Sequence, residues 1–320
     1  MSVAVLIPSY RGASHLRTLL PSLAEQTLRP AEIWIGDEDD PETREIASDH
    51  GAFYLRLDQN NGFAATVNRL VEASRAPYIA VLNNDIRLDA QWLERLSRHL
   101  ETHPFAAGKL RSWDGQVLDG SWDLLSLSGF PLRCGHGKRD AEYYSRRREI
   151  GSAPWTAILM RRDYFEAVGP LEEHFGSFYE DVDFGLRSCA KGYQGVYDPQ
   201  AECWHRGSAT FGERAARQVE LSARNQLLLL AKHGGWRWVE RWPKEFWVGQ
   251  ALSLAAAARH GQFWAAWRGK RAGWTALRQS KAELSEEMAQ GLEAMQGEVF
   301  EASNQGGAHP FWRYYWALTL

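Results

Sequence analysis

Residues 78–89, with the sequence YIAVLNNDIRLD, begin as an apolar run and continue into amides and acids. The run YIAVL at 78–82 is typical of a buried strand, and Asn83, Asn84 and Asp85 follow it directly. Three earlier runs of the same type are VAVLIP at 3–8, AEIWIG at 31–36 and AFYLRL at 52–57. Helical patterns occur between runs of this kind, at 15–26 and 64–74. This alternation predicts an α/β fold with βαβ units and a mostly parallel sheet.

Polar residues follow the predicted strands where they end. Asp37 comes after the second strand, Asn61 and Gly62 come after the third, and Asp85 comes after the fourth. In an open α/β sheet, ligands bind beyond the carboxyl ends of the strands. We therefore expect these residues to gather at one edge of the sheet and to form a binding site.

The residue types in these loops favour a phosphate-containing ligand that is held through a cation. The chain lacks both the G-x-G-x-x-G and the G-x-x-x-x-G-K-[ST] fingerprints, so neither a dinucleotide fold nor a P-loop is indicated. Carboxylates repel phosphates, but a divalent cation can bridge the two because it takes oxygen ligands. Asp85 supplies one such ligand, with amide oxygens at Asn83 and Asn84, whereas Asp37 suits a base or a ribose hydroxyl. Each loop taken singly is also explained by a helix cap or an Asx-turn.

A second acidic motif lies at 178–187, FYEDVDFGLR, and His205 follows it in AECWHRG at 201–207. Its carboxylates are Glu180, Asp181 and Asp183. One of them is either a general base or a cap for the helix that the motif begins. The two roles are compatible, since the dipole of a helix stabilises an acid at its N-terminus.

The composition excludes several classes of protein. The net charge of −3 over 320 residues argues against nucleic acid as a partner. The three cysteines are widely spaced and form neither a disulfide framework nor a paired-cysteine zinc site, and Cys134 with His136 lacks further ligands at a zinc spacing. The N-terminal MSVAVLIPSYRG is expected to be a strand rather than a signal peptide, and no stretch is apolar enough to span a membrane. We expect a cytoplasmic protein, either free or peripheral at the inner face of the cell membrane.

The C-terminal third differs from the rest in aromatic content and charge. Seven tryptophans lie between Trp236 and Trp274, and residues 214–281 hold 13 Lys or Arg against three Glu. This shift predicts a boundary near residue 215 between a catalytic domain, 1–215, and a helical region, 216–320. The helices with Trp and Arg either dock on an anionic membrane surface or pack against the catalytic domain with their cations in solvent.

In collinear order, residues 3–232 resemble glycosyltransferase family 2, which consists of inverting enzymes with the GT-A fold. The resemblance rests on LIPSYRGASHLRTLLPSLAEQTLRPAEIWIGDEDD at 6–40, NNGFAATVNRLVEASRAPYIAVLNND at 60–85 and EAVGPLEEHFGSFYEDVDFGLRSCAKGYQGVYDPQAECWHRGSAT at 166–210. RNQLLLLAKH at 224–233 is similar to a segment of bacterial rhamnosyltransferase-like members. The resemblance implies a GT-A domain with a nucleotide-sugar-binding half, 1–108, an acceptor half, 109–215, and a helical C-terminal appendage.

The resemblance also implies roles for individual residues. The contacts to the nucleotide sugar would be Pro8, Asp37, Asn61, Gly62, Asn84 and Asp85. Asp85 and His205 would face Mn²⁺ or Mg²⁺, and Asp181 would be the general base. Glu180 and Asp183 would either contact the acceptor or orient their loop, and Trp155 either stacks on a sugar ring or belongs to the core.

The implied reaction is the metal-dependent, inverting transfer of one sugar in polysaccharide biosynthesis of the cell envelope. The donor would be dTDP-rhamnose or a UDP-sugar, and the acceptor a glycan, a lipid-linked sugar or a small molecule. Absence of the Gln-x-x-Arg-Trp signature favours a single transfer over a processive one. Two alternatives remain: a nucleotidyltransferase on a similar scaffold, and a non-catalytic relative that binds glycan or lipid.

Two departures from the family pattern bear on the site. Asn83 stands where an Asp-x-Asp motif would begin, so the diphosphate would hold most of the metal. The run Asp37-Glu38-Asp39-Asp40 replaces an Asp-Asn-Gly-Ser sequence, which adds negative charge near the expected nucleotide.

Overall fold

The computed structural model describes residues 1–59, 61–207 and 213–320, which divide into two compact units. The sheet unit comprises Met1–Asp123, Gly135–Gly176 and Phe184–Gly207. The helical unit comprises Leu124–Cys134, Ser177–Asp183 and Ser208–Leu320. The predicted acceptor half, 109–215, is therefore shared between the units, and residues 208–212 beside the predicted boundary lie outside the described residues.

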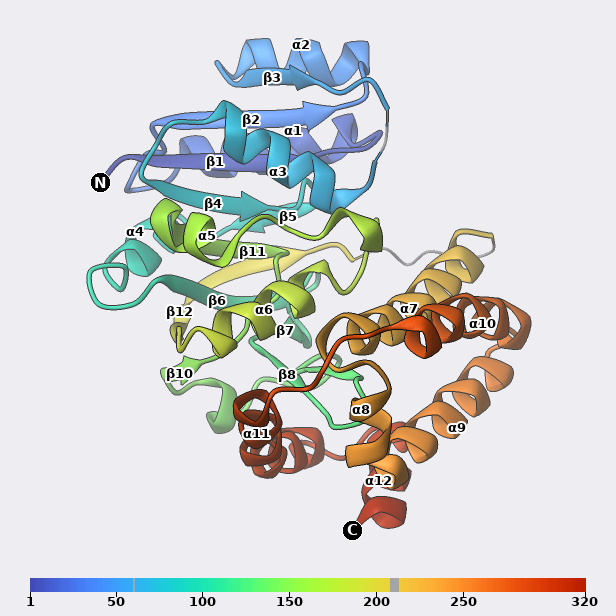
Figure 1. Ribbon diagram of the computed structural model, residues 1–320. Helices are drawn as coiled ribbons and strands as arrows, with labels where there is room; N and C mark the ends of the chain where they lie inside the picture. The colour runs from blue at the N-terminus through green and yellow to red at the C-terminus, as the bar shows by residue number, and fades with distance from the viewer. Residues whose placement is uncertain (60, 208–212) are drawn as a thin grey trace. The chain divides into compact units, whose positions relative to one another are not determined.

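A ten-stranded mixed sheet organises the sheet unit, with the order β10-β12-β6-β11-β4-β1-β2-β3, while β5 pairs with β12 and β7 with β6 (Figure 1). The predicted strands are confirmed as β1 Val3–Pro8, β2 Glu32–Asp37, β3 Phe53–Arg56 and β4 Tyr78–Leu82. The others are β5 Ile86–Leu88, β6 Phe105–Ser112, β7 Leu118–Gly120, β10 Arg148–Ile150, β11 Ala157–Arg161 and β12 Gly195–His205. Strands β4, β1, β2 and β3 are mutually parallel, so their carboxyl ends meet at one edge. Strand β11 runs antiparallel to β4 and β6.

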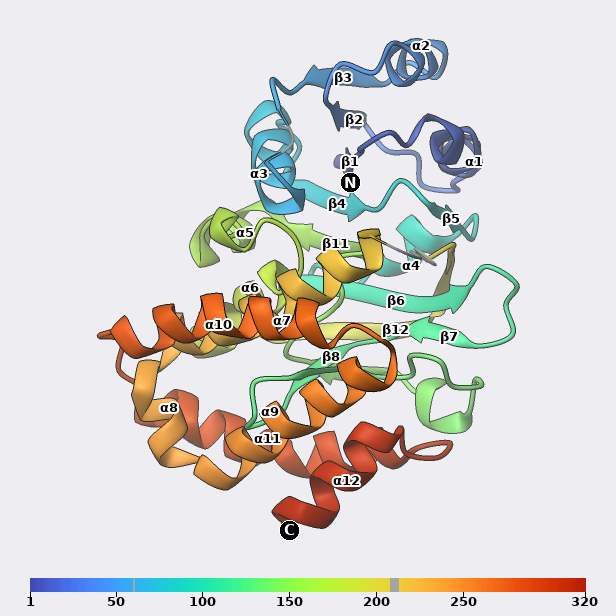
Figure 2. The ribbon, with the colours of Figure 1, turned by 90° about the vertical axis from the view of Figure 1, so that its right-hand side faces the viewer.

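Helices cover both faces of this sheet (Figure 2). Their bounds are α1 Ala13–Ala24, α2 Pro41–Asp49, α3 Phe63–Ala73, α4 Trp92–Ser97, α5 Arg162–Val168 and α6 Glu180–Ala190, with 3₁₀ turns η1 Glu142–Tyr144 and η2 Glu173–Phe175. Helices α1, α2 and α4 share a buried core with the alternate residues Val3, Val5 and Ile7 of β1. Helix α2 was not predicted: Asp40 caps it by accepting from the backbone N–H of Glu42, and Pro41 occupies its first turn.

The helical unit consists of α7 Glu213–His233, α8 Gly235–Arg241, α9 Pro243–Arg259, α10 Phe263–Gln279, α11 Glu286–Asn304 and α12 Pro310–Thr319. Helices α7 and α10 lie side by side (Figures 1 and 2). A Cβ at Gly269 would lie 2.1 Å from the carbonyl oxygen of Glu220, and one at Gly273 would lie 2.6 Å from that of Arg224. The two glycines therefore let the backbones of α7 and α10 approach closely.

A hairpin of strands β8, Asp123–Leu125, and β9, Pro131–Arg133, is anchored among these helices. The indole of Trp238 donates to the carbonyl of Leu127 at 2.7 Å, and Gln226 Nε2 donates to the carbonyl of Ser128 at 2.8 Å. Both donors are fully buried, so breaking either bond would leave a buried polar group unpaired. The hairpin thereby becomes a fixed part of the helical unit.

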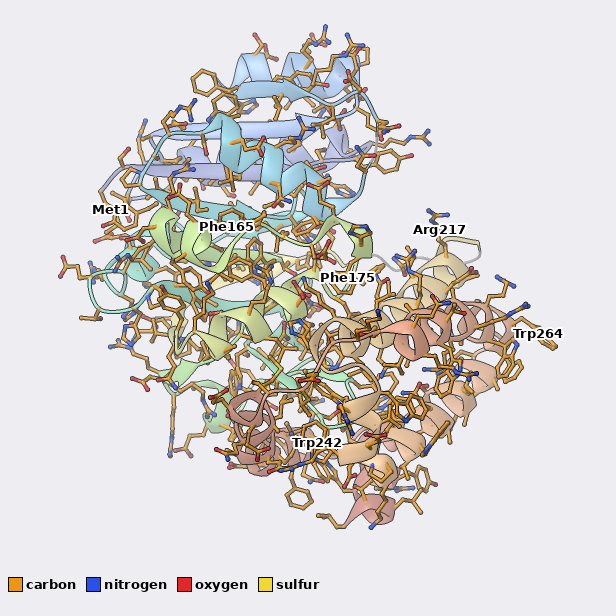
Figure 3. The ribbon with its side chains drawn as sticks, in the orientation of Figure 1. Met1, Phe165, Phe175, Arg217, Trp242 and Trp264 are labelled. Atoms are coloured by element: carbon orange, nitrogen blue, oxygen red, sulfur yellow. The ribbon has the colours of Figure 1, made fainter. Side chains whose placement is uncertain are left out.

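The tryptophans of the helical unit divide between its interior and its surface. Trp238 and Trp242 are buried, whereas Trp264 is 69% exposed and Trp267 is 48% exposed. Figure 3 shows Trp242 among the helices and Trp264 projecting outward. Within the described residues, every helix is too short or too polar to cross a bilayer.

Candidate active site

The loop that follows β1 packs on the loop that follows β4. Pro8 ends β1 opposite Gly36, and the amide of Asn84 donates to Ser9 Oγ at 3.1 Å. A Cβ at Gly12 would lie 1.9 Å from Asn84 Nδ2, so only glycine allows this approach. Asn84 thus fixes the loop after β1, and the expected edge of polar groups exists because three parallel strands end there.

Asp37 offers a buried acceptor at this edge. It is 1% exposed, its Oδ1 accepts from the backbone N–H of Asp40 at 3.0 Å, and its Oδ2 has no partner among the described residues. Burial raises the pKa of Asp37, while the hydrogen bond from Asp40 opposes the rise. An unpaired buried carboxylate oxygen is costly, which suits a ligand that brings an N–H or O–H donor.

Two of the additional acids after β2 have local partners. Asp39 pairs with Arg44, and its Oδ2 lies 3.3 Å from Arg56 Nη1. Asp40 accepts from Thr43 Oγ1 at 2.8 Å as part of its cap on α2. Asp39 is thus ion-paired, and Asp40 is occupied in the cap of α2.

Gly62 has a steric reason to be glycine. It precedes α3 with φ of 90°, and a Cβ there would lie 2.1 Å from the carbonyl oxygen of Gly176. Any other residue would be strained at this φ and would collide with the backbone. Asn61 is exposed beside it.

His205 lies between two carboxylates. Its Nε2 is 3.1 Å from Asp85 Oδ1, and its Nδ1 is 2.8 Å from Asp119 Oδ2. Burial opposes the charge on His205, but the two carboxylates outweigh it and raise the pKa of His205 to about 9. Burial likewise opposes ionisation of Asp85, yet the hydrogen bond and charge of His205 lower the pKa of Asp85 overall. Asp119, on β7, was not identified from the sequence.

This arrangement fits a divalent cation that receives most of its ligands from a substrate. Neighbouring ligands of an octahedral ion at about 2.1 Å lie about 3 Å apart. Asp85 Oδ1 and His205 Nε2 lie 3.1 Å apart, close to that spacing, and a cation bound there would replace the proton that Nε2 shares with Asp85 in this structure. Asp119 holds the opposite nitrogen of the ring, as carboxylates do behind histidines that bind metals. No group of three His, Cys, Asp or Glu side chains in the described chain is arranged to hold a metal by itself.

Asp181 belongs to a second group of polar residues, in the helical unit. It lies in the first turn of α6, its Oδ1 accepts from the backbone N–H of Val182 at 2.9 Å, and its Oδ2 lies 3.5 Å from Arg133 Nη2. Its side chain retains 17% exposure. Glu180 beside it is buried, with no partner at Oε2 in the described chain, and burial followed by the charge of Asp181 raises the pKa of Glu180 well above its usual range.

Two predicted acceptor contacts are corrected by their burial. Asp183 is fully buried, and its carboxylate lies 2.9 Å from Lys232 Nζ and 2.8 Å from His233 Nε2, so its oxygens serve an internal ion cluster. Trp155 is 3% exposed and packs edge-on against Phe184 at 4.9 Å between ring centroids. Trp155 is therefore a core residue rather than a sugar-stacking one, because neither face of its indole is open to a sugar.

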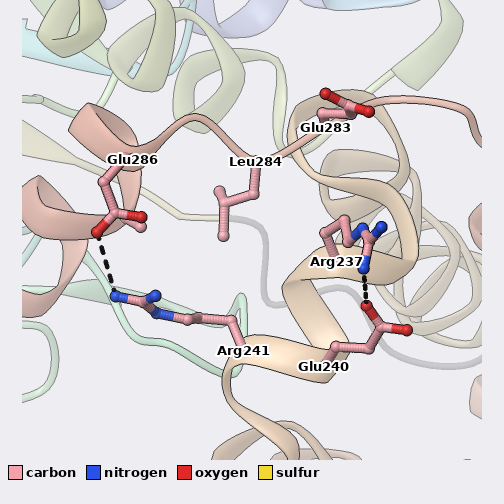
Figure 4. A pocket seen from close by; sticks show the side chains of 7 residues that line it. Arg237, Glu240, Arg241, Glu283, Leu284 and Glu286 are labelled. Atoms are coloured by element: carbon pink, nitrogen blue, oxygen red, sulfur yellow. Dashed lines mark hydrogen bonds and ion pairs between the residues drawn. The ribbon is translucent and has the colours of Figure 1, made fainter.

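A surface pocket of about 410 Å³ lies among α8, the chain at 283–284 and α11 of the helical unit (Figure 4). Arg237 pairs with Glu240 at 2.9 Å and Arg241 pairs with Glu286 at 3.4 Å, and Glu283 also lines the pocket. It contains none of the residues predicted from the sequence, and its two arginines and three glutamates identify no ligand.

The sequence matches the model of the family described as "Glycosyl transferase family 2" over residues 4–169. The N-acetylglucosaminyl-diphospho-decaprenol L-rhamnosyltransferase of Mycobacterium tuberculosis strain H37Rv is 24% identical, over 74% of this chain and 88% of that protein. The O-antigen biosynthesis protein RfbC of Myxococcus xanthus is 27% identical, over 65% of this chain and 17% of that protein.

Solved structures show the same fold at low sequence identity. The crystal structure of GalNAc-T7 with UDP, GalNAc and Mn²⁺ has a TM-score of 0.62 and 11% identity, over 93% of this chain and 58% of that one. Residues 1–349 of S. aureus TarS give a TM-score of 0.50 and 14% identity, over 86% of this chain and 92% of that one. These likenesses confirm the expected GT-A fold.

Proposed function

The chain belongs to glycosyl transferase family 2 and is a glycosyltransferase, and on this basis we propose that it transfers one sugar from a nucleotide diphosphate sugar to an acceptor hydroxyl with inversion. Family membership argues against the nucleotidyltransferase alternative, and turnover by the purified protein would set aside the non-catalytic relative. The observation that carries the proposal is the fixed line of Asp119, His205 and Asp85, a charged site at the edge where the parallel strands end.

The donor would bind at this edge of the sheet unit. Asp37 would accept a hydrogen bond from the base or ribose at its unpaired Oδ2. Asp85 and His205 would hold Mn²⁺ or Mg²⁺, which when bound neutralises charge on the leaving diphosphate. Asp119 would keep the His205 ring in place by accepting from Nδ1. Pro8, Asn61, Gly62 and Asn84 would shape the loops around the donor.

Asp181 would take the proton of the acceptor hydroxyl as that oxygen attacks the anomeric carbon. Its carboxylate is partly exposed, whereas those of Glu180 and Asp183 are buried, so Asp181 is the accessible base of the motif. Arg133 Nη2 lies 3.5 Å from Asp181 Oδ2 on the same unit. A positioned general base contributes about 10² to 10⁴ in rate.

The acceptor would be a lipid-linked sugar at the inner face of the cell membrane. The M. tuberculosis relative is named for a decaprenol diphosphate acceptor and for L-rhamnose, which favours a sugar on a polyprenyl diphosphate and dTDP-rhamnose as donor. Exposed Trp264 and Trp267 lie on α10, in a stretch from 246 to 282 without a single acidic residue. Such a surface suits anionic headgroups.

Asp181→Asn tests the assignment of the base. Turnover would be followed as release of nucleotide diphosphate from donor with a polyprenyl-diphosphate-linked N-acetylglucosamine acceptor, and donor binding by calorimetry. We expect kcat to fall by about 10² or more with donor affinity unchanged. Equal loss of turnover and of donor binding, or retention of both, would remove Asp181 as the base.

A further inference from the structure

The turn before α6 has an unfavourable backbone. Phe178 has φ of 71° and Tyr179 has φ of 74°, both in the left-handed region that side chains other than glycine rarely adopt. Two consecutive residues in this region persist only where their surroundings hold them, and such sites are often functional. Asp181 follows two residues later, so the position of its carboxylate depends on this turn.

Asn225, near the middle of α7, holds the turn. Its Nδ2 donates to the carbonyls of Ser177 at 2.9 Å and Phe178 at 2.8 Å. Its Oδ1 accepts from Arg224 Nε at 2.9 Å, which fixes the orientation of the amide. Asn225 is fully buried, so water cannot replace these bonds when the amide is removed.

The end of α7 holds the chain on the other side of Asp181. Lys232 and His233, in the last turn of α7, both bind the carboxylate of buried Asp183. The side chain of Asp181 itself keeps 17% exposure, and its Oδ2 lies 3.5 Å from Arg133 Nη2. One helix thus fixes the backbone before and after Asp181 and leaves the side chain between them accessible.

We propose that Asn225 is a positioning residue for Asp181: by gripping the carbonyls of Ser177 and Phe178, it holds the strained turn that aims the base at the acceptor. This inference rests on the proposed role of Asp181. It gives the helical region a part in the reaction, because α7 places the catalytic carboxylate. Displacement of a reacting group by about 1 Å costs up to about 100-fold in rate, so the amide would act on kcat.

Asn225→Ala removes the grip, and Gln250→Ala is its control, since Gln250 is a buried amide of the same unit that bonds to Gln226 and Lys270 instead. We expect Asn225→Ala to lower kcat about 10- to 100-fold with the donor KM unchanged, and Gln250→Ala to lose comparable thermal stability with kcat intact. Phe178 is 39% exposed, so Phe178→Gly can relieve the turn at little cost in packing. Added to Asn225→Ala, it should raise kcat again by about fivefold, because glycine adopts this φ without strain.

Assays of Asp181→Asn, run in parallel, distinguish failure of the positioning role of Asn225 from failure of the base assignment of Asp181. Loss of turnover in Asp181→Asn with kcat retained in Asn225→Ala would overturn the positioning role alone. Turnover retained in Asp181→Asn would remove the base assignment, and the positioning role with it. If Asn225→Ala does not fold, Phe178→Val tests the same turn, since a β-branched residue disfavours φ of 71°; an unchanged kcat there would also overturn the proposal.

Discussion

His205 and Asp85 lie 3.1 Å apart, one at the end of β12 and the other after β4, in the sheet unit. The contact depends on Asp119, which holds the opposite nitrogen of the imidazole at 2.8 Å. Three segments distant in the sequence therefore determine one site, and the residue that orients the histidine lies on a short strand, β7.

Asp119→Ala should weaken metal-dependent nucleotide binding about 10- to 100-fold, because His205 loses the acceptor that orients its ring. Titration of Mn²⁺ into protein with UDP or dTDP measures the effect. Asp114→Ala is the matched control, since Asp114 is exposed in the turn between β6 and β7. Equal metal affinity in the two variants would contradict the role of Asp119.

Glu180→Gln should keep kcat within about threefold, whereas Asp181→Asn should lose about 10² or more. Burial raises the pKa of Glu180 well above its usual range, which favours the neutral carboxyl that glutamine resembles in shape. Side-by-side turnover of the two variants decides the question. Comparable losses would show that ionised Glu180 takes part in the reaction.

Lys270 should make stability depend on pH. Its ammonium is buried on α10, donates to Gln250 Oε1, and lies 5.2 Å from the ring centroid of Phe130. Burial lowers the pKa of Lys270 from 10.5 to about 7. Between these values the unfolded chain binds a proton that the folded chain has released, so folding is favoured as pH rises, by at most about 1.4 kcal/mol per pH unit.

The measurement is urea unfolding of the wild type and of Lys270→Met at pH 6, 7, 8 and 9. Below about pH 7 both states of the wild type carry the proton, so the advantage of Lys270→Met is largest there and shrinks above it. Lys281→Met, at an exposed position, should follow the wild-type curve. A constant difference between wild type and Lys270→Met across this range would show that the lysine keeps its proton.

Trp264 and Trp267 should contribute to binding on anionic vesicles. Replacing both with serine should weaken partitioning to vesicles that contain phosphatidylglycerol about tenfold or more, because two exposed indoles no longer enter the headgroup region. Sedimentation with vesicles measures it, and high salt should also release the wild type. Trp236→Ser, a change at a less exposed indole on α8, is the comparison. If the double variant binds the vesicles as well as the wild type does, Trp264 and Trp267 do not form a membrane-binding surface.

The donor side could be predicted from sequence because strand direction determines it. Asp37, Asn84 and Asp85 follow apolar strands, and parallel strands bring their ends together whatever the details of packing. Asp119 could not be found in this way, since its strand, β7, has three residues and belongs to a hairpin with a weak pattern.

Burial was the harder property to foresee on the acceptor side. The pattern of the motif placed Asp181 and Asp183 alike in the first turn of a helix, but only tertiary contacts with Lys232 and His233 bury Asp183. Asn225 lies in α7 just before the run of leucines at 227–230, and helical periodicity cannot name the carbonyls that it binds. For the same reason, the sequence leaves undecided whether Trp155 stacks on a sugar ring or packs in the core.

The most direct test is calorimetric titration of the protein with UDP, dTDP and GDP, each with Mn²⁺ and with EDTA, repeated on Asp85→Ala. We predict that one nucleotide binds with Mn²⁺, and that affinity falls at least about tenfold with EDTA or in Asp85→Ala, since Asp85 would hold the cation that neutralises the diphosphate. The proposed donor site would be contradicted if none of the three nucleotides binds, or if binding is unchanged by both EDTA and Asp85→Ala.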